Sequence, residues 1–206
     1  VSVSSDGQPV VAYYAGATGA LVVTGCAAAC EVASSWQSAV VDDAAGDVGF
    51  SPSLTRTANG ALHVIYRDHG RGNVRYSSCL TGCTAAGGWA APVVIDAADD
   101  RGLVTDLAVG AGGSLVAIWT AEADHFLVFA TCAAGCSTPA NWSALEMTAT
   151  AGVTDRVQLS VDQADRPVVT LGRLDFVAVA ICRSTVCGAQ TNWTFLNLTQ
   201  DGLAGA

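Results

Sequence analysis

One phrase occurs four times in this chain of 206 residues: a pair of close cysteines, then a tryptophan six residues after the second cysteine. The first cysteines of successive copies are 53, 53 and 50 residues apart. Repeats of this length are typical of solenoids, propellers and arrays, in which each copy is one supersecondary unit. The copies are Cys26, Cys30 and Trp36; Cys79, Cys83 and Trp89; Cys132, Cys136 and Trp142; and Cys182, Cys187 and Trp193.

All eight cysteines belong to this phrase, so the pairing within each copy predicts four local disulfides. Zinc is the alternative, but a zinc site usually brings two such pairs together, often with histidine. Disulfides favour an oxidising compartment, and we expect a secreted or cell-surface protein. Each bridge closes a loop of about five residues, which stabilises the fold by only about 2 kcal/mol. The predicted bridges are Cys26–Cys30, Cys79–Cys83, Cys132–Cys136 and Cys182–Cys187.

The charge of the chain excludes several partners. Its net charge is −9, with nine arginines and no lysine. Nucleic acids and anionic membrane surfaces bind clustered basic residues, so neither is expected as a partner. Hydrophobic residues make up 51% of the chain, but no run of about 18 apolar residues indicates a membrane span. Cations, neutral sugars and basic protein surfaces remain as partners.

Each repeat contains four short segments with strand patterns, separated by turn residues such as Asp6-Gly7 and Asn59-Gly60. The first strand of each repeat is expected at residues 1–5, 53–57, 106–109 and 157–161. Four short strands per repeat without helical periodicity favour a propeller blade. We therefore predict an all-β fold, a β-propeller of four four-stranded antiparallel blades of about 52 residues each, with one disulfide hairpin per blade. The blades of this single domain, 1–206, are expected at about 1–47, 48–100, 101–152 and 153–206.

Two closures compete for such a chain. The four blades either close a small ring or form half of an eight-bladed or longer ring, whose exposed ends pair with another copy. Large rings recur at one position of the second strand, as Tyr13, Tyr66 and Trp119, where packing between neighbouring sheets needs them. The fourth repeat has Leu171 there, so its packing is expected to differ.

The residues from Ser5 to Tyr14 read Ser-Asp-Gly-Gln-Pro-Val-Val-Ala-Tyr-Tyr and precede a cysteine pair and a tryptophan. In this order of motifs the chain resembles secreted bacterial β-propeller repeats, and more distantly the blades of sialidases and propeller lectins. The sialidase Asp-box, Ser-x-Asp-x-Gly-x-Thr-Trp, does not occur. The resemblance covers the whole chain, and it implies a fold rather than a chemistry.

Charged residues gather in two sets of loops that share one face of a propeller, and scaffold-borne loops are where binding sites concentrate. The alternative is that these are solvated turns, because Asp and Gly favour loops for conformational reasons. The candidate binding residues are Asp68, His69, Arg71, Asp99, Asp100, Arg101, Asp124 and His125. Clustered carboxylates also make calcium the natural ion, although no Asp-x-Asp-x-Asp-Gly loop occurs. The calcium candidates are Asp42, Asp43, Asp47, Asp96, Asp99 and Asp100.

These features favour an extracellular, non-enzymatic binding or adhesion module, with carbohydrate as the first ligand class and no required cofactor. One alternative is a structural subunit that assembles with other copies of itself. The other is a sialidase-like glycoside hydrolase, for which Asp68 and Asp124 are the conceivable carboxylate pair. No Gly-x-Ser-x-Gly, phosphate-loop or His-Glu-x-x-His motif occurs, so no catalytic residues are assigned.

Overall fold

The fold was analysed in a computed structural model, which describes residues 1–44, 46–98, 100–121, 125–173, 177–184 and 186–198. It is all-β: sixteen strands form four four-stranded antiparallel sheets, each built from four consecutive strands in chain order. This confirms the predicted strand content and the blade-like sheets. Four 3-10 turns and one kinked turn, η2 (Ala111–Gly113), complete the secondary structure of the described residues.

The strands of each sheet run from the first to the fourth repeat as follows. The first sheet holds β1 (Ser2–Val3), β2 (Pro9–Ala15), β3 (Ala20–Cys26) and β4 (Trp36–Asp42). The second holds β5 (Val48–Arg56), β6 (Leu62–Asp68), β7 (Asn73–Cys79) and β8 (Val93–Asp96). The third holds β9 (Arg101–Val109), β10 (Leu115–Ala121), β11 (Phe126–Cys132) and β12 (Ser143–Met147). The fourth holds β13 (Val153–Val161), β14 (Pro167–Arg173), β15 (Val177–Cys182) and β16 (Trp193–Asn197).

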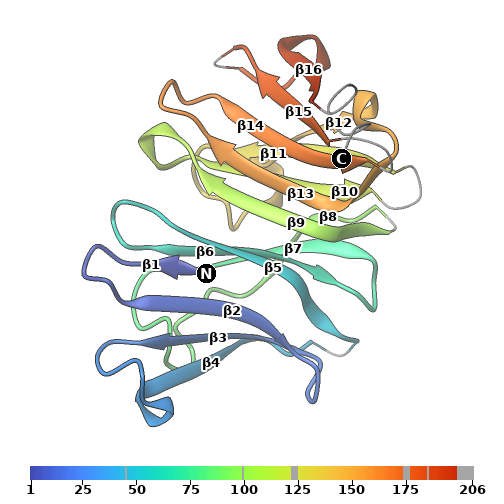
Figure 1. The fold of residues 1–206 in the computed structure, drawn as a ribbon. Helices are drawn as coiled ribbons and strands as arrows, with labels where there is room; N and C mark the ends of the chain where they lie inside the picture. Colours follow the sequence, from blue (N-terminus) through green and yellow to red (C-terminus); the bar gives the residue numbers. More distant parts are fainter. Residues whose placement is uncertain (45, 99, 122–124, 174–176, 185, 199–206) are drawn as a thin grey trace, which may run out of the picture.

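The four sheets are stacked face to face in chain order, with the first and fourth at opposite ends of the row (Figure 1). Each junction between neighbouring sheets contains its own apolar core. Because side chains alternate between the two faces of a strand, each inner sheet contributes one face to the preceding sheet and one to the next. We call these the proximal face, toward the preceding sheet in the chain, and the distal face, toward the following one.

The repeated cysteine–tryptophan phrase forms one local structure in every sheet. All four predicted disulfides are present, with Cα–Cα distances of 5.6 to 5.8 Å. In each copy the indole N–H of the tryptophan donates to the backbone carbonyl of the second cysteine, at 2.8 to 3.0 Å. The six-residue spacing is therefore required by a hydrogen bond that satisfies a largely buried indole and fixes the loop over its own sheet.

The first strands begin earlier than the alternating pattern predicts. β5, for example, starts at Val48 rather than at residue 53. Its register shifts between Val48 and Phe50 and again between Phe50 and Ser53, and Ser51 adopts a positive φ of 46°. A β-bulge of this kind moves side chains out of strict alternation, so the start of the strand does not show the period of two that marks a strand in a sequence.

At two junctions, a carboxylate at the end of one sheet's outer strand receives a ring from the next sheet's second strand. The Tyr66 hydroxyl donates to Asp42 Oδ2 at 2.6 Å, and Trp119 Nε1 donates to Asp96 Oδ2 at 2.8 Å. Both carboxylates also accept a backbone N–H two residues later. These rings are buried, so each hydrogen bond lies within the core that joins two sheets.

The third junction replaces this polar pair with an apolar one. Met147 pairs with Leu127 as Asp42 pairs with Leu21 and Asp96 with Val74, so Met147 holds the carboxylate's position. Leu171 holds the position of the ring, and both side chains lie in one buried cluster. The two positions therefore change together: a donor ring stands opposite a carboxylate, and leucine stands opposite methionine.

The innermost strands are joined by a second set of bonds. Ser53 Oγ accepts the backbone N–H of Leu107 at 3.0 Å. At the equivalent position of the third sheet, Asp106 Oδ2 accepts the backbone N–H of Leu159 at 2.7 Å. Ser53 Oγ also donates to Asp106 Oδ1 at 2.8 Å. A polar side chain at this position thus bonds the main chain of the following sheet.

Replacing Tyr66 by Phe should lower the free energy of unfolding by about 1–3 kcal/mol, because it removes a donor from the buried Asp42 carboxylate. The matched control is Tyr13→Phe at the equivalent position of the first sheet, where the hydroxyl has no partner among the described residues. That change should stay within about 0.5 kcal/mol. Urea denaturation of both variants measures the difference, and equal effects would contradict the proposed role of this bond.

Candidate functional site

The structure places several predicted loop residues in an ion-pair network between the first and second sheets. Asp68 is fully buried and accepts the backbone N–H of Arg71 at 3.1 Å and its guanidinium at 3.0 Å. Arg75 lies 3.8 Å from the same carboxylate and donates to Asp42. Burial, together with the hydrogen bond to Asp42, raises the pKa of Tyr66. Asp42 and Asp68 therefore neutralise neighbouring arginines inside the junction.

An analogous network lies between the second and third sheets. Arg101 donates to Glu146 Oε1 at 2.7 Å and lies 3.6 Å from Asp96 Oδ2. Its guanidinium carbon lies 5.5 Å from the centre of the Phe126 ring. Asp100 accepts a bond from the buried Arg67 at 3.3 Å and is itself exposed. Arg101 and Asp96 are thus held by partners on adjoining strands, with little surface left for a ligand.

The remaining candidates do not converge on one point. His69 stacks near Phe50 at 4.8 Å, and its N–H donates to the carbonyl of Asp47. His125 is exposed, and its carbonyl accepts the N–H of Val153. Asp99 and Asp124 lie outside the described residues. In the part of the chain that the structure describes, no group of three or more His, Cys, Asp or Glu side chains is placed to hold a metal ion. The calcium candidate Asp43 is exposed.

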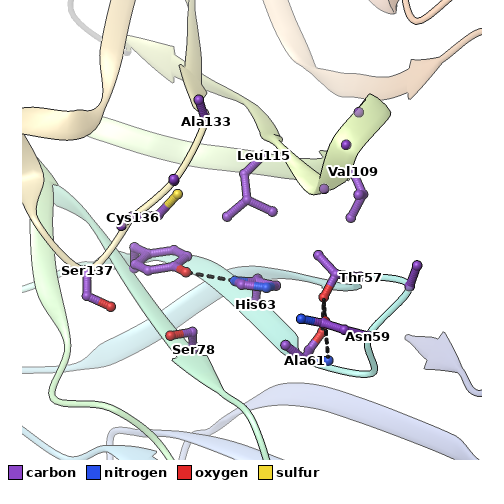
Figure 2. Close-up of a pocket in the computed structure, with 17 residues that line it drawn as sticks. Thr57, Asn59, Ala61, His63, Ser78, Val109, Leu115, Ala133, Cys136 and Ser137 are labelled. Atoms are coloured by element: carbon purple, nitrogen blue, oxygen red, sulfur yellow. Dashed lines mark hydrogen bonds between the residues drawn. The ribbon is translucent and has the colours of Figure 1, made fainter.

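A cavity of about 660 Å³ lies between the second and third sheets, at the end of the stack where the tight turns and disulfide loops gather. This is the end opposite the charged loops. Three loops form its rim: the β5–β6 turn, the glycine-rich turn after β9, and the loop closed by Cys132–Cys136. Figure 2 shows Leu115 and Val109 on one side of the hollow, facing His63 and Thr57. A volume of this size lies within the range of small-molecule sites.

The wall of the cavity combines neutral polar groups with apolar ones. The lining residues include no Asp, Glu, Lys or Arg. His63 Nδ1 lies 2.7 Å from the Tyr76 hydroxyl, the contact dashed at His63 in Figure 2. Asn59 Oδ1 accepts the Thr57 hydroxyl at 2.6 Å. The hydroxyl groups of Ser78 and Ser137 complete the polar side. The cavity can therefore offer several donors and acceptors to a ligand without offering it a charge.

Burial sets the protonation of this group. It lowers the pKa of His63, so the imidazole is neutral near pH 7. It raises the pKa of Tyr76, and a hydrogen bond with the Ser78 side chain opposes that rise. The hydroxyl stays protonated. A neutral imidazole has one donor and one acceptor nitrogen, so with Nδ1 accepting the hydroxyl proton, Nε2 carries the proton that can be donated.

The same positions are apolar or smaller at the first junction. Val10 and Val23 stand where the second sheet has His63 and Tyr76. Gly25 stands in the place of Ser78, and a Cβ built there would lie 2.8 Å from a methyl group of Thr84. The loop of the next sheet packs tightly against this glycine. The cavity at this junction is only about 170 Å³.

The third junction is also apolar at the two positions. Val116 and Phe129 stand where the second sheet has His63 and Tyr76. The Phe129 ring meets Trp193 edge-on at 4.8 Å, as Tyr76 meets Trp142 at 5.5 Å. The aromatic pair is thus common to both junctions, whereas the hydroxyl and the imidazole belong to the second junction.

Sequence reasoning missed this site because it searched for charge in loops, and His63 and Tyr76 lie within strands. A signal was nevertheless present. Sixteen residues before the first cysteine the repeats read Val10, His63, Val116 and, one position out of step, Val168. A single polar residue in an otherwise apolar column marks a place where packing alone does not explain the choice.

Replacing Asp68 by Ala should lower the free energy of unfolding by about 2–3 kcal/mol, because it leaves the half-buried Arg75 and the Arg71 backbone N–H without this acceptor. The control is Asp43→Ala, an exposed member of the same candidate set, which should change stability by less than about 0.5 kcal/mol. Chemical denaturation compares the two. An Asp68 variant as stable as wild type would mean that the carboxylate is free for ligands.

The pH dependence of stability should report on His63. The folded chain binds this proton less readily than the unfolded chain, whose histidine pKa is about 6.5. The free energy of unfolding should therefore decrease as the pH falls below about 6.5, and level off below the lowered folded pKa. His63→Val, which installs the residue of the first and third sheets, should remove this component. Parallel denaturation curves for both proteins from neutral to acidic pH would contradict it.

Comparison with known proteins adds no residue to this site. No protein-family model and no curated protein matches the chain. Within the described residues there is also no helix of the length and apolarity that crossing a membrane requires. The assignment of the cavity therefore depends on its geometry, on its neutral polar wall, and on the contrast with the equivalent positions of the neighbouring sheets.

Proposed function

We propose that the chain is an extracellular, non-enzymatic binding module, whose four sheets are blades of a β-propeller and whose cavity between the second and third sheets holds a neutral sugar unit. The observation that carries the proposal is the pair His63–Tyr76, polar groups in columns that are otherwise apolar, at the wall of a cavity of about 660 Å³. Burying such groups is unfavourable unless they are hydrogen-bonded.

A sugar suits this wall better than a charged ligand does. Its hydroxyl groups would meet the Asn59 amide, the Ser78 and Ser137 hydroxyls and the His63 N–H, while its C–H surface would lie against Leu115. With a neutral imidazole, the wall carries no formal charge to match a phosphate or an ammonium group. Ligand sites commonly have this composition, with a few placed polar groups in an apolar cavity.

The non-enzymatic part of the proposal is supported by the absence of paired carboxylates from the lining residues of the cavity, since glycoside hydrolysis uses two flanking the scissile bond. Asp68, one member of the conceivable pair, is already engaged by arginines. Four disulfides in local loops support an extracellular, oxidising environment.

A microarray of neutral mono- and oligosaccharides, followed by calorimetric titration with the strongest hit, tests the proposal. The double variant His63→Val with Ser78→Thr installs the residues of the third sheet, Val116 and Thr131. It should weaken binding at least about tenfold, because two hydrogen bonds of about 0.5–1.5 kcal/mol each are lost.

The matched control is Thr131→Ser, which makes the reverse change at the third junction and should leave the affinity unchanged. Two results would contradict the proposal: no neutral glycan binds the wild-type protein, or the double variant binds the same glycan with wild-type affinity.

A further inference from the structure

The two ends of the row present sheet faces whose equivalents elsewhere in the molecule are buried. On the proximal face of the first sheet, Tyr13 is 41% exposed and Val40 is exposed beside it. On the distal face of the fourth sheet, Leu196 is 44% and Leu198 59% exposed. No sheet of the described structure covers either face, since the two lie at opposite ends of the row (Figure 1).

Tyr13 is the repeat equivalent of Tyr66 and Trp119, each thirteen residues before the first cysteine of its copy. Those two rings are buried, and they reach the preceding sheet at the end of its outer strand. Tyr13 points in the same sense, away from the second sheet, because its strand neighbour Ala12 packs into the core of the first junction. It therefore has the form of an inter-sheet contact whose other half lies outside the described chain.

The distal face of the fourth sheet carries the complementary half. Leu198 stands where Asp42, Asp96 and Met147 receive the next sheet's residue, and its N–H donates to the Val177 carbonyl. Its apolar side chain suits a ring in the way that Met147 suits Leu171. A hollow of about 290 Å³ adjoins Val177, because Gly172 stands where the first three sheets carry Tyr14, Arg67 and Thr120.

The innermost strand of the fourth sheet repeats this preparation. Gln158 is the equivalent of Ser53 and Asp106, whose side chains accept backbone N–H groups of the following sheet. Gln158 is exposed on the distal face and lies at the edge of the same hollow. The distal face thus offers an acceptor for the main chain as well as an apolar floor for a ring.

We propose that a second copy of this chain covers these faces head to tail, with the proximal face of the first sheet in one copy packed on the distal face of the fourth sheet in the other. A second copy is the occupant because this contact continues the junction that the molecule already makes three times between its own sheets. Pairing two identical faces would instead bring Tyr13 against Tyr13, a contact with no equivalent in the chain.

A head-to-tail contact gives a closed ring if its rotation permits and an open filament otherwise. In either case the two faces are different surfaces, so blocking one leaves the other intact. The variant Tyr13→Asp blocks the proximal face, and Leu196→Asp blocks the distal face. Leu80→Asp is the matched control, because Leu80 is 67% exposed in the second disulfide loop and belongs to neither face.

Light scattering on the full chain over a range of concentrations tests the proposal. Wild type and Leu80→Asp should form dimers or longer assemblies, and each blocked variant alone should have its dissociation constant raised at least about tenfold. An equimolar mixture of the two blocked variants should form a heterodimer that grows no further, because each retains the face that the other lacks. Circular dichroism confirms that every variant is folded.

Three outcomes would overturn the proposal. A wild-type protein that stays monomeric up to its highest attainable concentration would show that no second copy binds these faces. Self-association of the Leu196→Asp variant alone at wild-type strength would indicate a contact between identical first-sheet faces. A mixture of the two blocked variants that stays monomeric would show that the two faces do not recognise each other.

Discussion

The row of sheets depends on contacts made where the outer strand of one sheet ends against the second strand of the next. A buried carboxylate such as Asp42 is unfavourable in an apolar junction unless it is fully bonded. Tyr66 and Arg75 supply those bonds from the neighbouring sheet. The hydrogen bond fixes how the sheets lie on each other, while the surrounding aliphatic side chains supply the apolar burial that stabilises them.

The same dependence explains where the molecule can tolerate variation. At the third junction Met147 and Leu171 satisfy the geometry without polar atoms, so the position requires a matched pair rather than a particular residue. The opposite ends of the strands are less constrained. There the loops leave cavities between the sheets, and the second junction has acquired an imidazole and a phenol. Scaffold and binding surface are thus separated along the length of each strand.

The fold could be predicted largely because its signals are local. Cysteines four or five residues apart can pair without knowledge of the rest of the chain, and alternating strands bounded by Asn-Gly or Asp-Gly turns read directly as hairpins. The early part of β5 escaped because its bulge at Ser51 breaks the alternation. In that case the pairing partner in β6, and not the local sequence, determines that the segment is a strand.

The candidate site was harder to predict for a related reason. Asp42 and Asp68 stand in loop-like sequence, and the arginine that engages both comes from the middle of a strand. Which loop carboxylates are neutralised depends on contacts across about thirty residues. His63 was discounted as part of a strand, although comparison of the four repeats at that column separates it from three valines. Repeats allow each copy to serve as the reference for the others, and this comparison is more informative here than any single motif.

The position of the disulfides has a consequence for how the protein matures. Each bridge joins cysteines that lie within one hairpin loop, and no bridge links two sheets. Each pair can therefore oxidise as soon as its own loop has emerged during synthesis, before the partners of later repeats exist. The correct partner is always the nearest thiol in the chain, so the chance of scrambled pairing is small. For the same reason, gene duplication or loss of a whole repeat changes the number of sheets without leaving an unpaired cysteine behind.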